Sequence, residues 1–101
     1  MGPEPVLRSA LAEIEGIREA FIFGSWADPA QRSAADIDVL VVGEPDVSEV
    51  YDAVSAIEAG LGRPVNMSIR SPAEWENGDG VFERGVKYGP RVDLIGAPST
   101  T

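Results

Sequence analysis

The stretch FIFGSWADPAQRSAADIDVLVVG, from Phe21 to Gly43, decides the fold. Its first residues are β-branched or aromatic, and this apolar run ends at Gly24 and Ser25. A polar stretch without periodicity follows, and a second apolar run then begins with Asp36 and Asp38. The stretch therefore predicts two strands joined by a loop, with polar side chains at the strand ends that flank the loop.

The two aspartates are separated by a single residue. Residues two apart on a strand project from the same face with Cα atoms roughly 6.5 to 7 Å apart, so both carboxylates can bind one metal ion or a close pair. Two like charges beside an apolar strand are costly unless a cation joins them. Magnesium carrying a nucleoside triphosphate suits this role. The alternative is that Asp36 and Asp38 are solvated residues at a strand start.

The Gly24-Ser25 turn supplies a second polar feature. A glycine at a strand end lets the backbone come close to a ligand, and Ser25 with the following amides offers donors for phosphate oxygens. The alternative is an ordinary turn in which Ser25 caps a short helix that starts at Trp26. Combined with paired carboxylates one strand later, the turn supplies both halves of a metal-triphosphate site.

Composition narrows the classes of function. The chain has 101 residues, 17 acidic against 8 basic side chains and a formal charge of -9. This charge repels phosphate backbones, so we expect no direct nucleic-acid binding by this domain, whereas a divalent metal or a basic partner suits it. Without cysteine or histidine, disulfides, the usual zinc sites and imidazole bases are excluded. No apolar run approaches the roughly 20 residues of a membrane span, and we expect a cytoplasmic location.

Helical and strand patterns alternate along the chain. Helices are predicted in segment 6–16, from Asp46 to the glycines at 60 and 62, from Ser71 to the breaker at 77–80, and over Val81–Tyr88; strands are predicted over Ile17–Phe23, Asp36–Gly43, Val65–Arg70 and Arg91–Ile95. Trp26 and Trp75 are expected to pack against the sheet, with base stacking as the alternative for Trp26. The order predicts an α/β (α+β) fold in one domain, 1–101, with a mixed sheet of about four strands and helices mainly on one face.

The residues GSWA and, after a short loop, DIDVLVVG resemble the signature of the minimal nucleotidyltransferases of the DNA polymerase β superfamily. The segment YDAVSAIEAGLGRPVNMSIRSPAEW is similar to nucleotidyltransferase-like domains fused behind winged-helix regulators of the arsenical-repressor type. Together the resemblances cover the chain from Pro5 to Ile95. They imply a polymerase β palm-like nucleotidyltransferase fold, with Mg²⁺ or Mn²⁺ and a nucleoside triphosphate, ATP in the first instance, as cofactor and substrate.

The resemblance also implies roles for individual residues. Gly24 and Ser25 match the phosphate-binding turn, and Asp36 and Asp38 match the two metal-binding aspartates, which are the catalytic pair. Active members carry a third carboxylate on a neighbouring strand, and Asn66 stands at the matching position here. An amide can offer a carbonyl oxygen to a metal but cannot take a proton.

Four further residues bear on this comparison. Asp93, on the last predicted strand, would replace the missing carboxylate if that strand lay near the site. Active relatives often have a basic residue soon after the Gly-Ser turn, where this chain has Asp28. Arg32 and Arg70 are therefore the candidates for further nucleotide contacts, with ordinary solvation as the alternative.

Three functions stay open at this level. The chain is a metal-dependent nucleotidyltransferase that moves a nucleoside monophosphate to a hydroxyl, a degenerate nucleotide-binding sensor within a transcriptional regulator, or an antitoxin-like partner of a helical toxin protein. A domain of this size has little room for its own acceptor-recognition module. We therefore expect a basic or helical protein partner, a fused winged-helix domain or a homo-oligomer to complete the substrate site.

Overall fold

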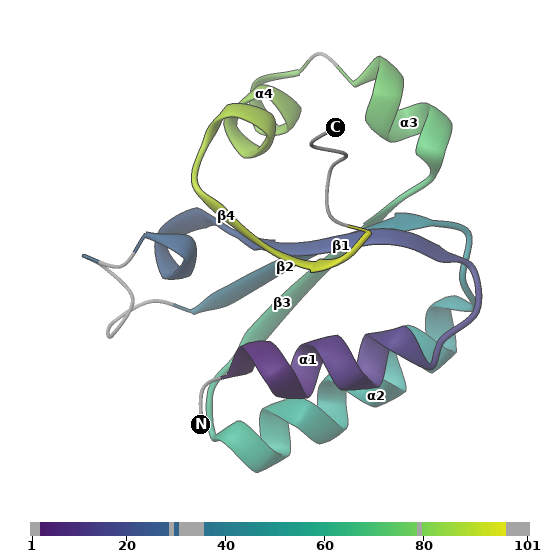
Figure 1. The fold of residues 1–101 in the computed structure, drawn as a ribbon, viewed down its shortest axis with the longest axis vertical. Coiled ribbons are helices and arrows are strands. Elements are labelled where there is room, and N and C mark those ends of the chain that lie inside the picture. Colours follow the sequence, from purple (N-terminus) through teal and green to yellow (C-terminus); the bar gives the residue numbers. More distant parts are fainter. Residues whose placement is uncertain (1–2, 29, 31–35, 79, 97–101) are drawn as a thin grey trace.

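The computed structural model describes residues 3–28, 30, 36–78 and 80–96, in which helices and strands alternate (Figure 1). The helices are α1 (Pro3–Ala12), α2 (Val47–Leu61), α3 (Pro72–Asn77) and α4 (Val81–Tyr88), together with a short 3-10 helix, η1 (Gly24–Ala27); the strands are β1 (Ile17–Phe23), β2 (Ile37–Gly43), β3 (Val65–Arg70) and β4 (Arg91–Ile95). The predicted order of elements is confirmed. The differences are small: α1 begins at Pro3, η1 begins at Gly24, and Asp36 lies just before β2.

The four strands form one mixed sheet in the order β3-β2-β1-β4. β1 pairs antiparallel with both β2 and β4, and β2 pairs parallel with β3. A parallel pair needs a long crossover connection, which α2 provides between β2 and β3. The predicted mixed four-stranded sheet is therefore confirmed, and the two strands of the deciding stretch, β1 and β2, lie at its centre.

Both faces of the sheet are covered (Figure 1). The two longest helices, α1 and α2, pack on one face, and the shorter α3 and α4 lie over the other. The larger core lies under α1 and α2 and includes Leu7, Leu11, Val50, Val54, Ile37, Val39 and Val41. The smaller core lies between the sheet and the helices α3 and α4, and its described members are Phe21, Leu40, Val42, Trp75 and Val86. β2 contributes to both cores, which explains its continuous apolar run.

Helix boundaries follow the capping residues in the sequence. Asp46 accepts hydrogen bonds from the backbone amides of Ser48, at 3.0 Å, and Glu49, at 3.4 Å, and so caps α2. Gly62 ends α2 in the left-handed conformation, with φ of 67°. At α3 the complete capping box is formed, because Ser71 Oγ accepts from the Glu74 amide and Glu74 Oε1 accepts from the Ser71 amide.

Strand β4 contains a bulge that α1 stabilises. Ala20 pairs with Ile95 and Phe21 pairs with Asp93, so Leu94 is an additional residue on β4. Arg8 of α1 donates from Nε to the Leu94 carbonyl oxygen at 3.2 Å and from a terminal nitrogen to the Asp93 carbonyl oxygen at 2.9 Å. One side chain thus satisfies two consecutive carbonyls at this edge of the sheet.

No helix of the described part is long and apolar enough to cross a membrane.

Candidate functional site

Two of the polar residues singled out from the sequence, Asp38 and Asn66, meet at one end of the central strands. Phe23, the last residue of β1, pairs with Asp38 of β2, and Asp38 pairs in turn with Asn66 of β3. On the other side, Phe23 pairs with Arg91, the first residue of β4. Side chains in one such row project from the same face of a sheet. The row Asn66–Asp38–Phe23–Arg91 therefore lies on the face that α3 and α4 cover.

Asp38 is held between two neighbours. Its Oδ1 accepts a hydrogen bond from Nδ2 of Asn66 at 3.0 Å. On its other side lies Gly24, where an added Cβ would come within 2.9 Å of Asp38 Oδ2. Gly24 has φ of 76°, which glycine adopts at little cost. A residue with a side chain would be strained by this backbone conformation and would displace the carboxylate, so glycine is favoured at position 24.

The structure describes some of the other predicted members of the site fully, some only in part and one not at all. Asp36 is exposed and lies two residues before Asp38, immediately ahead of β2. Ser25 belongs to η1, and the structure describes its backbone but not its side chain. Arg32 lies outside the described residues. The carboxylate of Asp28, where active relatives often have a basic residue, accepts a hydrogen bond from the amide of Ala30 at 3.0 Å.

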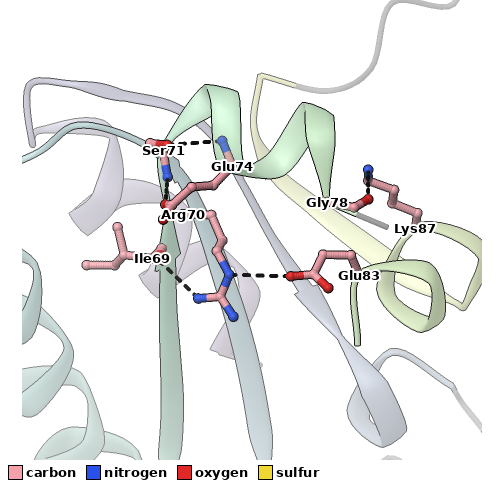
Figure 2. A network of polar contacts seen from close by, with 7 residues as sticks. All are labelled: Ile69, Arg70, Ser71, Glu74, Gly78, Glu83 and Lys87. Carbon is pink, nitrogen blue, oxygen red and sulfur yellow. Dashed lines mark hydrogen bonds and ion pairs between the residues drawn. The ribbon is translucent and has the colours of Figure 1, made fainter. Parts of the chain in front are cut away.

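Arg70 lies on the same face as Asn66 but at the other end of β3. It pairs with Val42, four residues along β2 from Asp38, which corresponds to roughly 13 Å at about 3.3 Å per residue. Figure 2 shows its guanidinium between the carbonyl oxygen of Ile69, at 3.2 Å, and Glu83 of α4, at 3.9 Å. Within one chain, Arg70 is therefore not part of the row that contains Asp38.

Asp93 does not take the place of the third carboxylate. β4 lies beyond β1, on the side away from β3, and Asp93 pairs with Phe21. Its Oδ1 accepts from Nε of Arg91 at 3.1 Å and lies 3.0 Å from a terminal nitrogen of the same guanidinium. The conditional role for Asp93 is thus excluded by the strand order, and Asn66 is the residue that faces Asp38.

Arg91 is a member of the row to which sequence reasoning assigned no role. Its guanidinium lies 3.9 Å from the centre of the Phe21 ring and 3.7 Å from the carboxylate of Glu19. The side chain therefore turns back along the sheet, away from Asp38. Arg91 enters this row only because β4 pairs with β1. No local sequence pattern predicts that pairing.

The tryptophans pack, as expected. Trp26 is 4% exposed and belongs to the larger core, so base stacking by this ring is not supported. Trp75 is 7% exposed, and its ring centre lies 5.7 Å from that of Phe21. Lys87 of α4 lies 4.8 Å above the Trp75 ring and donates to the Gly78 carbonyl oxygen (Figure 2). These contacts hold α3 and α4 against the sheet.

The residues at the Asp38 end fit a magnesium–nucleotide complex better than a metal held by protein alone. Within the described ranges no group of three or more acidic, histidine or cysteine side chains converges. Magnesium is typically bound by one or two carboxylates and by substrate phosphates. Asp36 and Asp38 would supply the carboxylates for such a complex, and Gly24 places no side chain beside Asp38. Asn66 would orient Asp38 or, with its amide reversed, offer a carbonyl oxygen.

Comparison with known proteins agrees with this fold. A family model described as a nucleotidyltransferase domain matches residues 5–88. A search of curated proteins finds no match.

Three of the solved structures of similar fold come from toxin–antitoxin systems. A toxin–antitoxin structure with AMP-PNP aligns with a TM-score of 0.65 and 18% identity, over 92% of this chain and 73% of that one. A mutant of the toxin–antitoxin MntA-HpeT aligns with a TM-score of 0.63 and 12% identity, over 95% of this chain and 74% of that one. The structure of the tri-AMPylated Shewanella oneidensis HEPN toxin in complex with MNT antitoxin aligns with a TM-score of 0.60 and 15% identity, over 93% of this chain and 70% of that one. At these identities the likeness is one of fold. Because the family model spans most of its length, the chain belongs to the nucleotidyltransferase domain family.

Proposed function

We propose that this chain binds a magnesium or manganese complex of a nucleoside triphosphate, ATP in the first instance, at the Asp38 end of its sheet. The observation that carries the proposal is the position of Asp38, whose carboxylate lies against the backbone of Gly24 and accepts from Asn66. Asp36 and Asp38 hold the metal, which when bound neutralises charge on the phosphates. The backbone of the Gly24 turn is the phosphate contact. The similar structure with AMP-PNP supports a nucleotide of this class.

The bound nucleotide is a donor of its nucleoside monophosphate to a hydroxyl group. The hydroxyl oxygen forms a bond to the α-phosphorus, the bond from that phosphorus to the bridging oxygen breaks, and pyrophosphate leaves. The hydroxyl proton must pass to a base. Asn66 cannot accept it, so transfer is slow at this site unless a partner or the solvent takes the proton. Nucleotide binding does not depend on such a base.

Binding of ATP is tested by calorimetry with magnesium present. We expect the double variant Asp36→Ala, Asp38→Ala to lose at least about 100-fold in affinity, which is about 2.7 kcal/mol, because both metal carboxylates are removed. Asp52→Ala is the matched control, since Asp52 is an exposed carboxylate on α2, within the opposite helix layer. Equal heats from wild type and the double variant would refute the nucleotide site.

Transfer is tested with ATP labelled at the α-phosphate and proteins of a host-cell lysate as acceptors. Asn66→Asp restores a carboxylate beside Asp38, and we expect the rate of label transfer to rise about 10- to 100-fold. Asn66→Ala is the control, because it removes the hydrogen bond to Asp38 without adding a base. A rate for Asn66→Asp at or below that of the wild type would show that Asn66 does not limit the chemistry.

A second candidate function is that of an antitoxin-like partner of a toxin protein. Three structural relatives come from toxin–antitoxin complexes, one with an AMPylated toxin, and the charge of -9 favours a basic partner. In this case the hydroxyl acceptor is a side chain of the toxin. Co-expression with a candidate helical toxin tests this: the chain should co-purify with it and relieve its growth inhibition, and the absence of both effects would remove the candidate.

A further inference from the structure

Strand β3 forms one edge of the sheet, and its outward backbone groups can be assigned from the register. The amide of Ile37 donates to the carbonyl oxygen of Pro64, and the parallel pairing then directs the groups of Asn66, Ser68 and Arg70 toward β2. The amides and carbonyls of Val65, Met67 and Ile69 consequently point away from the sheet.

Two of these outward groups are already satisfied by side chains. Glu58 accepts from the Val65 amide at 2.7 Å, and Arg70 donates to the Ile69 carbonyl oxygen at 3.2 Å. Four outward groups have no hydrogen-bond partner among the described residues: the Val65 carbonyl, both groups of Met67, and the Ile69 amide. Unpaired groups along an exposed edge form a template for another strand.

The four groups are complementary to those of a second copy turned about a two-fold axis at Met67. In that antiparallel register Met67 faces Met67 of the partner subunit and exchanges two hydrogen bonds with it. The Ile69 amide then donates to the Val65 carbonyl of the partner subunit, and the reverse bond forms by symmetry. In this register the Val65 amide of one copy would donate to the Ile69 carbonyl of the other. Both of these groups are already capped by side chains of their own chain. The side-chain caps thus replace this bond and its symmetry mate and leave the other groups available.

The side chains suit the same arrangement. The segment Val65–Ile69, VNMSI, alternates apolar and polar residues symmetrically about Met67, so apolar pairs meet on one face and polar pairs on the other. β3 contains no acidic residue and is flanked by Arg63 and ends with Arg70, although the whole chain carries -9. The carboxylate at this edge, Glu58 on the Val65 amide, comes opposite Ile69 of the partner subunit, next to Arg70 of the partner subunit, so the two copies of Glu58 do not face each other.

We propose that two copies of the chain pair through β3 into a continuous sheet and that this pairing completes the nucleotide site. With the axis at Met67, Asn66 faces Ser68 of the partner subunit, and Arg70 of the partner subunit is the diagonal neighbour of Asn66, roughly 7 to 8 Å away between Cα atoms. The axis is perpendicular to the sheet, so this arginine lies on the face that carries Asp38. The guanidinium, distant from Asp38 within its own chain, leaves the Ile69 carbonyl and Glu83 and then reaches the triphosphate bound across the dimer.

The pairing is tested independently of nucleotide. Since the chain has no cysteine, Met67→Cys places a unique thiol at the axis, where paired Cα atoms about 5.5 Å apart permit a disulfide. We expect a covalent dimer on oxidation, and none from Ser55→Cys on the exposed face of α2. In sedimentation at up to about 1 mM protein, Met67→Ala should associate like the wild type, because it keeps the amide, and Met67→Pro should not. A monomeric wild type, or association unchanged by Met67→Pro, would overturn the dimer.

The contribution of Arg70 in trans rests on the proposed nucleotide site and has its own test. Asp38→Ala and Arg70→Ala each bind ATP poorly when pure. Mixed in equal amounts, they form heterodimers in which one site combines an intact Asp38 with an intact Arg70 of the partner subunit, so about a quarter of the wild-type binding capacity returns. Arg70→Ala with wild-type affinity, or a mixture no better than the pure variants, would refute the trans arginine. ATP binding absent from the wild type would instead refute the proposed function, while cross-linking still decides the dimer.

Discussion

At the scale of single residues, the close approach of Gly24 to Asp38 should make both stability and ATP binding sensitive to a side chain at position 24. Gly24→Ala forces a left-handed residue with a Cβ to lie 2.9 Å from Asp38 Oδ2. We expect the free energy of unfolding to fall by about 1 to 2 kcal/mol because of the backbone conformation. ATP affinity should fall as well, because the carboxylate must move. Chemical denaturation and calorimetry measure the two effects.

Gly85→Ala is the matched control for this substitution. Gly85 lies inside α4 with no atom within 4 Å of an added Cβ. Alanine should therefore stabilise the protein by about 0.5 to 1 kcal/mol through helix propensity and leave ATP binding unchanged. If Gly24→Ala and Gly85→Ala had the same effect, the close approach of Gly24 to Asp38 would have no energetic importance.

At the scale of the element, two helix caps make stability depend on pH. Hydrogen bonds from Ser48 and from the backbone of Glu49 hold the pKa of Asp46 below its ordinary 3.8, and bonds from the backbone and side chain of Ser71 hold the pKa of Glu74 below 4.5. A carboxylate with a lowered pKa in the folded state stabilises it above the unfolded-state pKa, and this contribution disappears as the pH falls through the folded-state value.

The variants Asp46→Asn and Glu74→Gln keep an acceptor and remove the charge. We expect the stability difference between wild type and each variant to be complete above about pH 5 and to vanish at lower pH, starting from 4.5 for Glu74 and from 3.8 for Asp46. Urea titrations at pH 2 to 7 measure this difference. A difference that did not change with pH would show that the charge of the caps contributes nothing.

The helices and strands could be predicted from the sequence because the residues that mark them are neighbours in the sequence. Asp46, the pair Ser71 and Glu74, and the glycine at 62 mark helix ends through their own neighbours in sequence, and the structure confirms each cap. The paired aspartates are equally local. The partners of Asp38 are different, because Asn66 reaches it only through the crossover formed by α2. The resemblance to a family suggested that neighbour, whereas the residue pattern alone did not.

At the scale of the whole molecule, the two faces of the sheet differ in the amount of core beneath their helices. α1 and α2 cover the larger cluster, and among the described side chains the cluster beneath and within α3 and α4 has five buried members, of which Trp75 and Val86 come from these helices. Regions with fewer buried contacts open more readily than the rest of a fold. The α3–α4 layer should therefore be the less stable of the two.

Hydrogen exchange measures this difference directly. Amides of α3 and α4 should exchange at least about 10-fold faster than those of α2 under native conditions, since their opening does not require the larger core to unfold. Trp75→Leu should speed exchange in α3 and α4 and leave α2 unaffected. Equal protection of both layers would mean that the sheet and all four helices open as one unit.

The strand order also determines which parts of the chain can assemble early in folding. β1 and β2 are joined by one loop, and β3 follows through α2, whereas β4 must return from the end of the chain to pair with β1. Closing a short connection costs less entropy than closing a long one, so we expect pairing of β1, β2 and β3 to precede the addition of β4. Gly24, Asp38 and Asn66 all belong to the earlier part. We therefore expect the Asp38 end of the sheet to form early in folding and β4, to which Arg8 donates two hydrogen bonds, to be the last strand to join.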